Sequence, residues 1–207
     1  MFIVFEGLEN SGKTTQARIL YESLQAKGVS CVLTRDPGGA DSSRPIRDML
    51  LNPKMDIGER AELLCYMAAR VELVEKIIRP ALDRGDVVIC DRFVDSTLAY
   101  QGYGNHYADE QVLEFIKQSH DLFTSGLWPD VTILLEIDLE DSLERFDGAR
   151  DRVESRDSHY FMRVKQGYYL LSGEESRFRV VPGNAPIEIV SMGVWNVVLP
   201  YLEEVLM

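Results

Sequence analysis

Short apolar runs alternate along this chain with longer stretches in which apolar residues recur every three or four positions. The runs predict strands at 2–5, 29–33, 86–90, 131–137 and 187–190. The periodic stretches predict helices, one ending near residue 27 and others at 42–51, 58–82, 96–102, 109–122, 155–171 and 192–206. Strands that alternate with helices pair in parallel through right-handed crossovers. The pattern predicts an α/β fold, a doubly wound five-stranded parallel sheet with helices on both faces, in a single domain over 1–207.

The segment from Gly7 to Thr14, with the sequence GLENSGKT, fits the pattern G-x-x-x-x-G-K-[ST] at every fixed position. Glycines let backbone N–H groups turn inward around a polyphosphate, the lysine reaches the β- and γ-phosphates, and the threonine hydroxyl holds Mg²⁺. The two glycines could instead flank an ordinary turn. A predicted strand precedes the segment and a predicted helix follows it, and this order favours a nucleotide-binding loop.

Further polar residues follow two other predicted strands at their carboxyl ends, the edge at which open α/β sheets bind ligands. Thr34 to Gly39, with the sequence TRDPGG, follows the second strand, and Asp91-Arg92 follows the third. An acidic residue at this point is typical of the metal site in phosphate-loop enzymes. Taken alone, the first segment also fits a Pro-Gly turn, and the second also fits a surface ion pair.

The apolar periodicity lapses between residues 139 and 152. Arg145, Arg150 and Arg152 are interspersed there with acidic residues and glycine. A charged stretch of this kind is commonly a solvated surface. Beside a phosphate-binding loop, arginines that close over phosphates are the better interpretation. We therefore expect a mobile lid at about 141–158, with Arg150 as the first candidate for its catalytic cation.

Charge and composition limit the class of partner. Acidic residues outnumber basic ones 34 to 22, and the net charge of -12 argues against a nucleic acid or an anionic membrane as the main partner. No apolar run approaches the roughly 18 residues of a membrane span, and no basic leader precedes the first strand, so we expect a cytoplasmic location. Cys31, Cys65 and Cys90 are too widely spaced for metal ligands, and we expect buried core thiols.

A series of motifs runs in order across nearly the whole chain. They are Phe5-Glu6-Gly7, the loop through Thr14-Thr15, Thr34 to Gly39, Ala68-Ala69-Arg70, Asp91-Arg92-Phe93, Ser96-Thr97, Ala99 to Gly102 and Gly167-Tyr168. Together they resemble the bacterial type of thymidylate kinase. The resemblance implies a fold similar to other P-loop nucleoside monophosphate kinases, ATP-dependent phosphorylation of dTMP to dTDP with Mg²⁺, and a homodimer.

The resemblance also implies roles for individual residues. ATP would bind to the phosphate loop, which comprises Gly7, Leu8, Glu9, Asn10, Ser11, Gly12, Lys13, Thr14 and Thr15. Mg²⁺ would be held by Thr14 and Asp91. The dTMP site would comprise Glu9, Arg35, Asp36, Arg47, Tyr66, Arg70, Arg92, Ser96, Thr97, Tyr100, Gln101 and Tyr168. The expected catalytic cations are Lys13, Arg92, Arg145, Arg150 and Arg152.

Two other functions fit parts of the pattern. One is a kinase for another pyrimidine deoxynucleoside monophosphate, including a 5-modified one, because a methyl-sized pocket cannot be seen in sequence. The more remote one is a regulatory GTPase. Its guanine-reading motif Asn-Lys-x-Asp is missing, because Pro53-Lys54-Met55-Asp56 has proline in place of asparagine.

Overall fold

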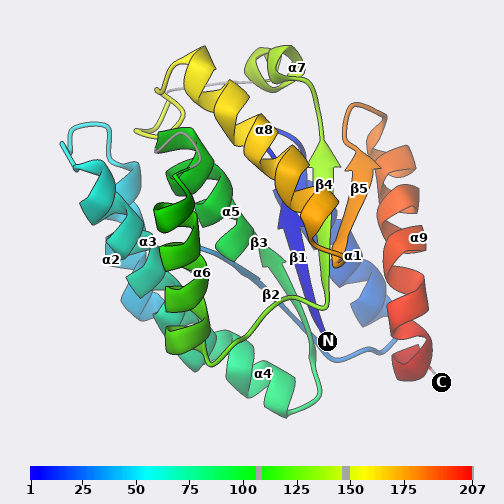
Figure 1. The fold of residues 1–207 in the computed structure, drawn as a ribbon. Helices are drawn as coiled ribbons and strands as arrows, with labels where there is room; N and C mark the ends of the chain where they lie inside the picture. Colours follow the sequence, from blue (N-terminus) through cyan, green and yellow to red (C-terminus); the bar gives the residue numbers. More distant parts are fainter. Residues whose placement is uncertain (106–108, 146–149, 207) are drawn as a thin grey trace.

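The computed structural model describes residues 1–105, 109–145 and 150–206. Its centre is a five-stranded sheet formed by β1 (Phe2–Glu6), β2 (Cys31–Arg35), β3 (Val87–Asp91), β4 (Val131–Glu136) and β5 (Phe178–Pro182). The strands lie in the order β2-β3-β1-β4-β5, and every neighbouring pair is parallel. Helices pack on both faces of the sheet (Figure 1). The predicted doubly wound α/β fold is confirmed.

One face of the sheet is covered by α1 (Lys13–Ala26) and α9 (Ile187–Leu206), which lie side by side. Ile3 and Phe5 of β1 belong to the apolar cluster under these helices, whereas Phe2 and Val4 belong to the cluster on the opposite face. Successive side chains of a strand point to opposite faces. Because both faces are covered, the strands need the continuous apolar runs seen in the sequence.

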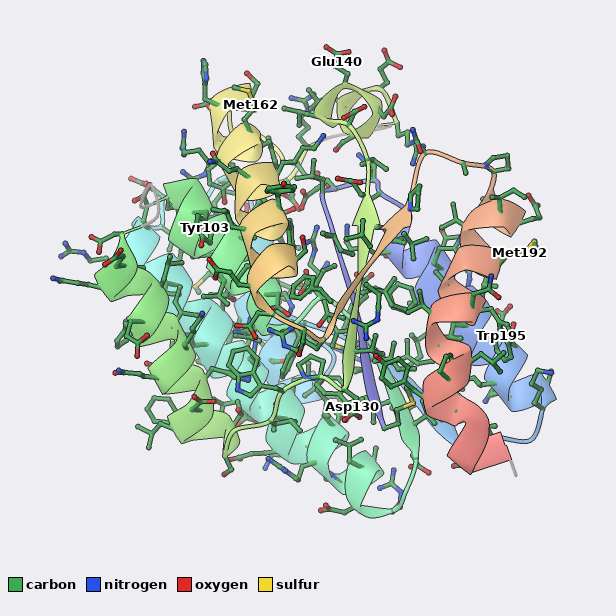
Figure 2. All side chains as sticks on the ribbon, turned by 45° about the vertical axis from the view of Figure 1, so that its right-hand side comes forward. Tyr103, Asp130, Glu140, Met162, Met192 and Trp195 are labelled. Atoms are coloured by element: carbon green, nitrogen blue, oxygen red, sulfur yellow. The ribbon has the colours of Figure 1, made fainter. Side chains whose placement is uncertain are left out.

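The opposite face is covered by α3 (Glu59–Leu73), α4 (Arg79–Asp83), α5 (Val94–Thr97), α6 (Glu110–Thr124) and α8 (Ser158–Glu174). A π-helical turn at Val74–Ile78 joins α3 to α4, and a second π-helical segment, Leu98–Asn105, follows α5. This second segment packs closely on α8, where Tyr103 lies beside the helix (Figure 2). A Cβ atom on Gly167 would lie 2.7 Å from the Tyr103 ring, so the close approach requires glycine.

Two smaller helices, α2 (Arg44–Leu51) and α7 (Leu139–Glu144), complete the fold. A 3₁₀ turn at Asp41–Ser43 precedes α2. The helix α7 follows the carboxyl end of β4, so the beginning of the charged stretch at 139–152 has regular structure that the sequence did not predict. At the other end of the sheet, Asp130 accepts a 2.6 Å hydrogen bond from the Phe2 N–H (Figure 2).

The predicted strand at 187–190 is wrong. These residues form the first turn of α9, and the fifth strand is instead Phe178–Pro182. Ile187 and Ile189 are exposed, whereas Val190 is buried together with Val194 and later residues at helical spacing. A short apolar run does not distinguish a strand from a helical turn by itself.

The prediction of buried cysteines holds only in part. Cys90 is buried in β3, but Cys31 and Cys65 are half-buried, so the prediction is wrong for these two. Cys31 belongs to β2, which lies at the edge of the sheet and is covered less completely. Among the described helices, none is long and apolar enough to cross a membrane.

Candidate active site

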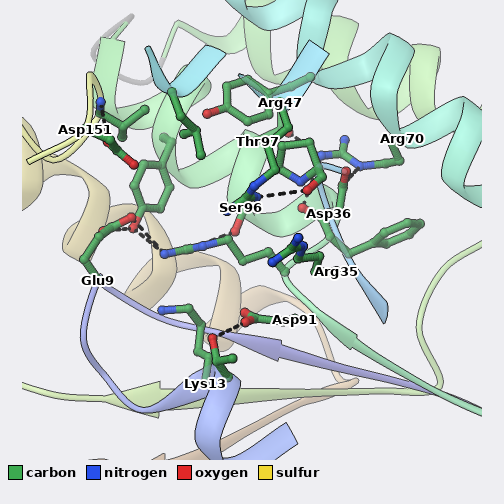
Figure 3. A pocket seen from close by; sticks show the side chains of 18 of the residues that line it. Glu9, Lys13, Arg35, Asp36, Arg47, Arg70, Asp91, Ser96, Thr97 and Asp151 are labelled. Atoms are coloured by element: carbon green, nitrogen blue, oxygen red, sulfur yellow. Dashed lines mark hydrogen bonds and ion pairs between the residues drawn. The ribbon is translucent and has the colours of Figure 1, made fainter. Parts of the chain in front are cut away.

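The carboxyl ends of β1, β2 and β3 open into a cavity of about 290 Å³ (Figure 3). Most of the polar residues predicted from the sequence line it, although they come from distant parts of the chain. They are Glu9, Asn10, Lys13, Thr14, Arg35, Asp36, Arg47, Tyr66, Arg70, Asp91, Arg92, Ser96, Thr97, Tyr100 and Gln101. The volume is near the lower end of the range for small-molecule sites.

The phosphate loop joins β1 to α1 in a conformation that its sequence permits. Gly7 has a φ of 141°, and a Cβ atom there would lie 2.5 Å from the Leu135 carbonyl oxygen, so only glycine fits. Asn10 has a φ of 57°, a left-handed conformation that asparagine tolerates better than most residues. The loop ends at the N-terminus of α1, where free backbone N–H groups and the helix dipole favour an anion.

Lys13 is buried at the base of the loop. Its Nζ donates to the Leu8 carbonyl oxygen at 2.5 Å and to Ser11 Oγ at 3.3 Å. Burial and the positive charge of Arg92 lower the pKa of Lys13 to about 8. An anion in the loop would favour the charged ammonium form.

Thr14 and Asp91 meet across the loop, although they are far apart in the sequence. The Thr14 hydroxyl donates to Asp91 Oδ2 at 2.5 Å. A hydroxyl beside a carboxylate supplies the oxygen ligands that Mg²⁺ prefers, and Mg²⁺ commonly takes only one or two carboxylates together with phosphate and water. The described residues contain no cluster of three or more His, Cys, Asp and Glu suited to a metal. The pair therefore fits a nucleotide-bound Mg²⁺ rather than a metal held by protein alone.

Three arginines bring positive charge to the cavity: Arg35, Arg47 and Arg92. Arg47 donates from Nη1 to the Pro37 carbonyl oxygen at 2.9 Å. Burial lowers the pKa of Arg47, and the charge of Arg35 lowers it further. Gathering like charges in a half-buried space is unfavourable unless an anion binds there, so these arginines suit an anionic ligand.

Arg92 is held by a network of hydrogen bonds. Its Nη1 donates to the Gly7 carbonyl oxygen and to Ser96 Oγ, each at 3.0 Å. Its Nη2 donates to Glu9 Oε1 at 2.9 Å and to the Tyr100 hydroxyl at 3.2 Å. The Tyr100 hydroxyl also donates to Glu9. These contacts fix the guanidinium plane before any substrate arrives.

Tyr168 does not line the cavity, contrary to the role that the resemblance implied. Its hydroxyl lies behind Arg92, where it accepts from Arg92 Nη1 at 3.2 Å and donates to Glu6 Oε2 at 2.7 Å. Glu6 is fully buried and also accepts from Ser96 Oγ at 2.5 Å. Burial, reinforced by the nearby Asp95 carboxylate, raises the pKa of Glu6 to about 7. In the sequence, Glu6 is a single acidic residue at the end of an apolar strand. We assigned no function to it from the sequence.

The wall of the cavity contains a buried ion pair. Arg70 Nε donates to Asp36 Oδ2 at 2.6 Å, and Arg70 Nη2 donates to Thr97 Oγ1 at 2.5 Å (Figure 3). The two charged side chains are only 4% and 1% exposed. Burial raises the pKa of Asp36, and Arg70 opposes this shift. The pair holds the Arg70 guanidinium in one orientation at the cavity wall.

Tyr66 and Gln101 also line the cavity. Burial and the charge of Glu62 raise the pKa of Tyr66, so its hydroxyl stays neutral. Gln101 donates from Nε2 to Glu62 Oε1 at 2.8 Å. An aromatic ring beside polar side chains of this kind suits a planar heterocycle.

The arginines of the expected lid lie in three different places. Arg145 Nη1 donates to the Gly183 carbonyl oxygen at 3.1 Å and to that of Asn10 at 3.4 Å. Arg150 lines a small hollow beside Glu9 and Asn10 of the phosphate loop. Residues 146–149 of the expected lid lie outside the described residues.

Arg152 is held by groups outside the phosphate loop. Its Nη1 contacts Glu62 Oε2 at 2.6 Å, and its Nε donates to the Leu50 carbonyl oxygen at 2.7 Å. Sequence reasoning missed Glu62 because its neighbours in space come from remote segments. An acid within a helix is ordinarily exposed, and nothing local marked this one as buried.

Comparison with known proteins identifies the family. The family model described as thymidylate kinase matches residues 5–193. The chain belongs to the thymidylate kinase family. The enzyme class and function predicted from the sequence, a kinase that phosphorylates dTMP with ATP, are therefore confirmed.

Individual relatives agree over nearly their whole length. A thymidylate kinase of Exiguobacterium sibiricum is 40% identical over 207 residues, which cover 98% of this chain and 96% of the relative. One from Synechococcus sp. strain JA-2-3B'a(2-13) is 43% identical over 204 residues, with 98% and 96% covered. The crystal structure of thymidylate kinase from Ehrlichia chaffeensis superposes with a TM-score of 0.75 at 35% identity, covering 96% of this chain and 98% of that one.

Proposed function

We propose that the cavity binds dTMP lengthwise, with the base at the Arg70 end and the phosphate at the arginine-rich end, facing ATP on the phosphate loop. The observation that carries this proposal is the lining of one cavity, which combines an aromatic ring and polar side chains with three arginines. The thymine ring stacks on Tyr66, and Arg70, Thr97 and Gln101 read its edge. An aromatic face grips any base, so the choice among bases comes from the groups on the edge.

Arg35, Arg47 and Arg92 hold the phosphate of dTMP. Glu9 lies near the sugar, fixed by Arg92 and Tyr100. The attacking oxygen belongs to a phosphate that is already ionised, so no general base is needed. Catalysis then consists of aligning the phosphates and neutralising the charge that spreads over the transferred group.

Residues of the loop from Gly7 to Thr15 hold the phosphates of ATP, and Lys13 neutralises the β- and γ-oxygens. Thr14 and Asp91 would hold Mg²⁺, which supplies further neutralisation of the phosphates when bound. The contact between the Thr14 hydroxyl and the Asp91 carboxylate supports this assignment.

Arg150 remains our first choice for the cation that stabilises the transition state, because it lies beside Glu9 and Asn10 of the phosphate loop. Arg145 is the second choice, since it contacts the loop at the Asn10 carbonyl. Arg152 is the weakest candidate, because Glu62 already holds its guanidinium. Closure of the segment at about 141–158 over the phosphates would also exclude water.

We further propose that the enzyme is a homodimer formed through α3 and α6, which lie side by side. Leu64 of α3 is 54% exposed, and Leu122 and Phe123 of α6 are 74% and 57% exposed. Large apolar side chains gathered on adjacent helices are typical of a protein interface. The cytoplasmic location stays a prediction.

A coupled assay of ADP release over a panel of monophosphates tests the proposed substrate. We expect dTMP to give the highest kcat/KM, followed by dUMP, with dCMP and dGMP far behind. A higher kcat/KM for any monophosphate other than dTMP would contradict the assignment of the base end.

A further inference from the structure

Glu62 is a buried acid that does not line the cavity itself, and three side chains contact its carboxylate. Its Oε1 accepts from Gln101 Nε2 at 2.8 Å. Its Oε2 accepts from Arg152 Nη1 at 2.6 Å and from Arg156 Nη2 at 3.4 Å. The Glu62 side chain is 1% exposed. A carboxylate this deeply buried needs its cationic partners to remain charged.

The ionised form of Glu62 determines how the Gln101 amide is oriented. A carboxylate only accepts hydrogen bonds, whereas an amide has a donating NH₂ group and an accepting oxygen. Gln101 must therefore turn its NH₂ group to Glu62. The amide oxygen has no donor among the described residues, and Gln101 lines the cavity, so this oxygen is left to face a ligand.

An acceptor fixed at this point distinguishes pyrimidines by their hydrogen-bond polarity. Thymine and uracil carry an N–H group at N3 and an accepting oxygen at C4. Cytosine has an unprotonated N3 and a donating amino group at C4. The Gln101 oxygen can pair with the N3–H of the first two, while cytosine would leave it facing a lone pair. Burying a polar group against the wrong partner is the strongest source of discrimination available to such a site.

We propose that Glu62 is a positioning residue for base selection: by accepting from Gln101 it locks the amide so that the enzyme accepts pyrimidines with an N3–H and rejects cytosine. This inference rests on the proposed placement of the base beside Gln101. Arg152 and Arg156 contribute by keeping Glu62 charged. The expected lid is thereby tied to the base end of the cavity through its residues Arg152 and Arg156.

The test measures kcat/KM for dTMP and for dCMP in wild type and in Glu62→Gln. A glutamine at this position can donate as well as accept, so it permits both orientations of Gln101. We expect the ratio of kcat/KM for dTMP to kcat/KM for dCMP to fall by about tenfold or more, which is the effect of satisfying or losing one buried hydrogen bond. The KM for ATP should stay unchanged. A purely structural role would lower both kcat/KM values alike and leave the ratio intact, which would overturn the proposal.

Glu59→Gln is the matched control. It removes the same charge from the first turn of the same helix, and its carboxylate lies 3.8 Å from Arg156. The hydrogen bond with Gln101 is made by Glu62, so Glu59→Gln should keep the wild-type ratio. A fall in the ratio equal to that of Glu62→Gln would show a general charge effect and overturn the proposal.

A charge-swapped double variant, Glu62→Gln with Gln101→Glu, provides the rescue and also serves if Glu62→Gln does not fold. Glu at position 101 can only accept, and Gln at position 62 can donate to it, so the cavity again presents an acceptor. We expect the dTMP to dCMP ratio to return toward the wild-type value. A ratio still lowered by about tenfold would refute the locking role. Failure of the wild type to phosphorylate dTMP would instead refute the proposed function.

Discussion

Replacing Arg70 by methionine removes the cation from a buried ion pair. Arg70 and Asp36 are 2.6 Å apart, and their side chains are 4% and 1% exposed. Methionine fills much of the space of the arginine stem but leaves Asp36 without its ion-pair partner, although the charge of Arg47 still acts on the carboxylate. Asp36 Oδ1 already has no hydrogen-bond partner among the described residues, so the carboxylate cannot recover its lost contacts locally.

We expect Arg70→Met to lower the free energy of unfolding by about 3–5 kcal/mol, the usual cost of leaving one charge of a buried pair unpaired. Arg44→Met is the control, because the Arg44 and Asp41 side chains are 64% and 89% exposed. Its loss should not exceed about 1 kcal/mol. Urea unfolding followed by circular dichroism measures both values.

The dependence on pH gives a second readout. Burial raises the pKa of Asp36 even beside Arg70, and removing Arg70 must raise it further. In Arg70→Met the destabilisation should be complete above this raised pKa, where the folded protein has to bury a charged carboxylate. It should shrink as the pH falls through that pKa toward the unfolded value of about 3.9, because the folded state then takes up a proton.

The double variant Asp36→Asn with Arg70→Met isolates the charge. It leaves no buried carboxylate, so its loss should be smaller than the sum of the two single losses. The reasoning is refuted if Arg70→Met costs less than about 1 kcal/mol, or if the two single losses simply add.

Burial lowers the pKa of Lys13 to about 8 in the free enzyme, so kcat/KM for ATP should fall as the pH rises through this value and the ammonium group loses its proton. A pH profile of kcat/KM that stays flat up to the ordinary lysine pKa would contradict this. Lys13→Ala should abolish phosphoryl transfer without unfolding the protein. Tyr66→Ala should raise the KM for dTMP by the loss of about 1–3 kcal/mol of stacking while the KM for ATP stays fixed; a selective rise in the KM for ATP would mean that the two sites are exchanged. Arg150→Ala should lower kcat by on the order of 10² or more with little change in the KM for dTMP. If alanine at Arg145, Arg150 and Arg152, singly and together, never lowers kcat about tenfold, the catalytic cation lies elsewhere.

The sequence alone determined those features in which a local pattern forces a local structure. The phosphate loop was visible because its glycines, lysine and threonine occupy fixed positions within one turn between a strand and a helix. The sheet was visible in outline because strands buried on both faces require continuous apolar runs. Because parallel strands end together, the sequence also placed Arg35, Asp91 and Arg92 at the carboxyl-terminal edge of the sheet.

The fifth strand shows where local patterns fail. Phe178–Pro182 has charged Arg179 at its second position and proline at its end, which is permitted because β5 lies at the edge of the sheet. The run Ile187–Val190 has better strand composition but adopts a helix. The run is helical because Val190 begins an apolar stripe that continues along α9 to Leu202 and packs against the sheet.

Only the tertiary structure decided how the side chains of the site are held. Glu62, Gln101 and Arg152 come from three separate segments, and their contacts depend on how α3, the second π-helical segment and the lid pack together. Glu6 became a central acceptor only because α5 and α8 bring donors to it. Burial is a property of the folded chain, and it is burial that makes a charge costly to leave unpaired. The sequence thus determined which chemical groups are present, whereas packing decided which of them line the cavity and which hold those that do.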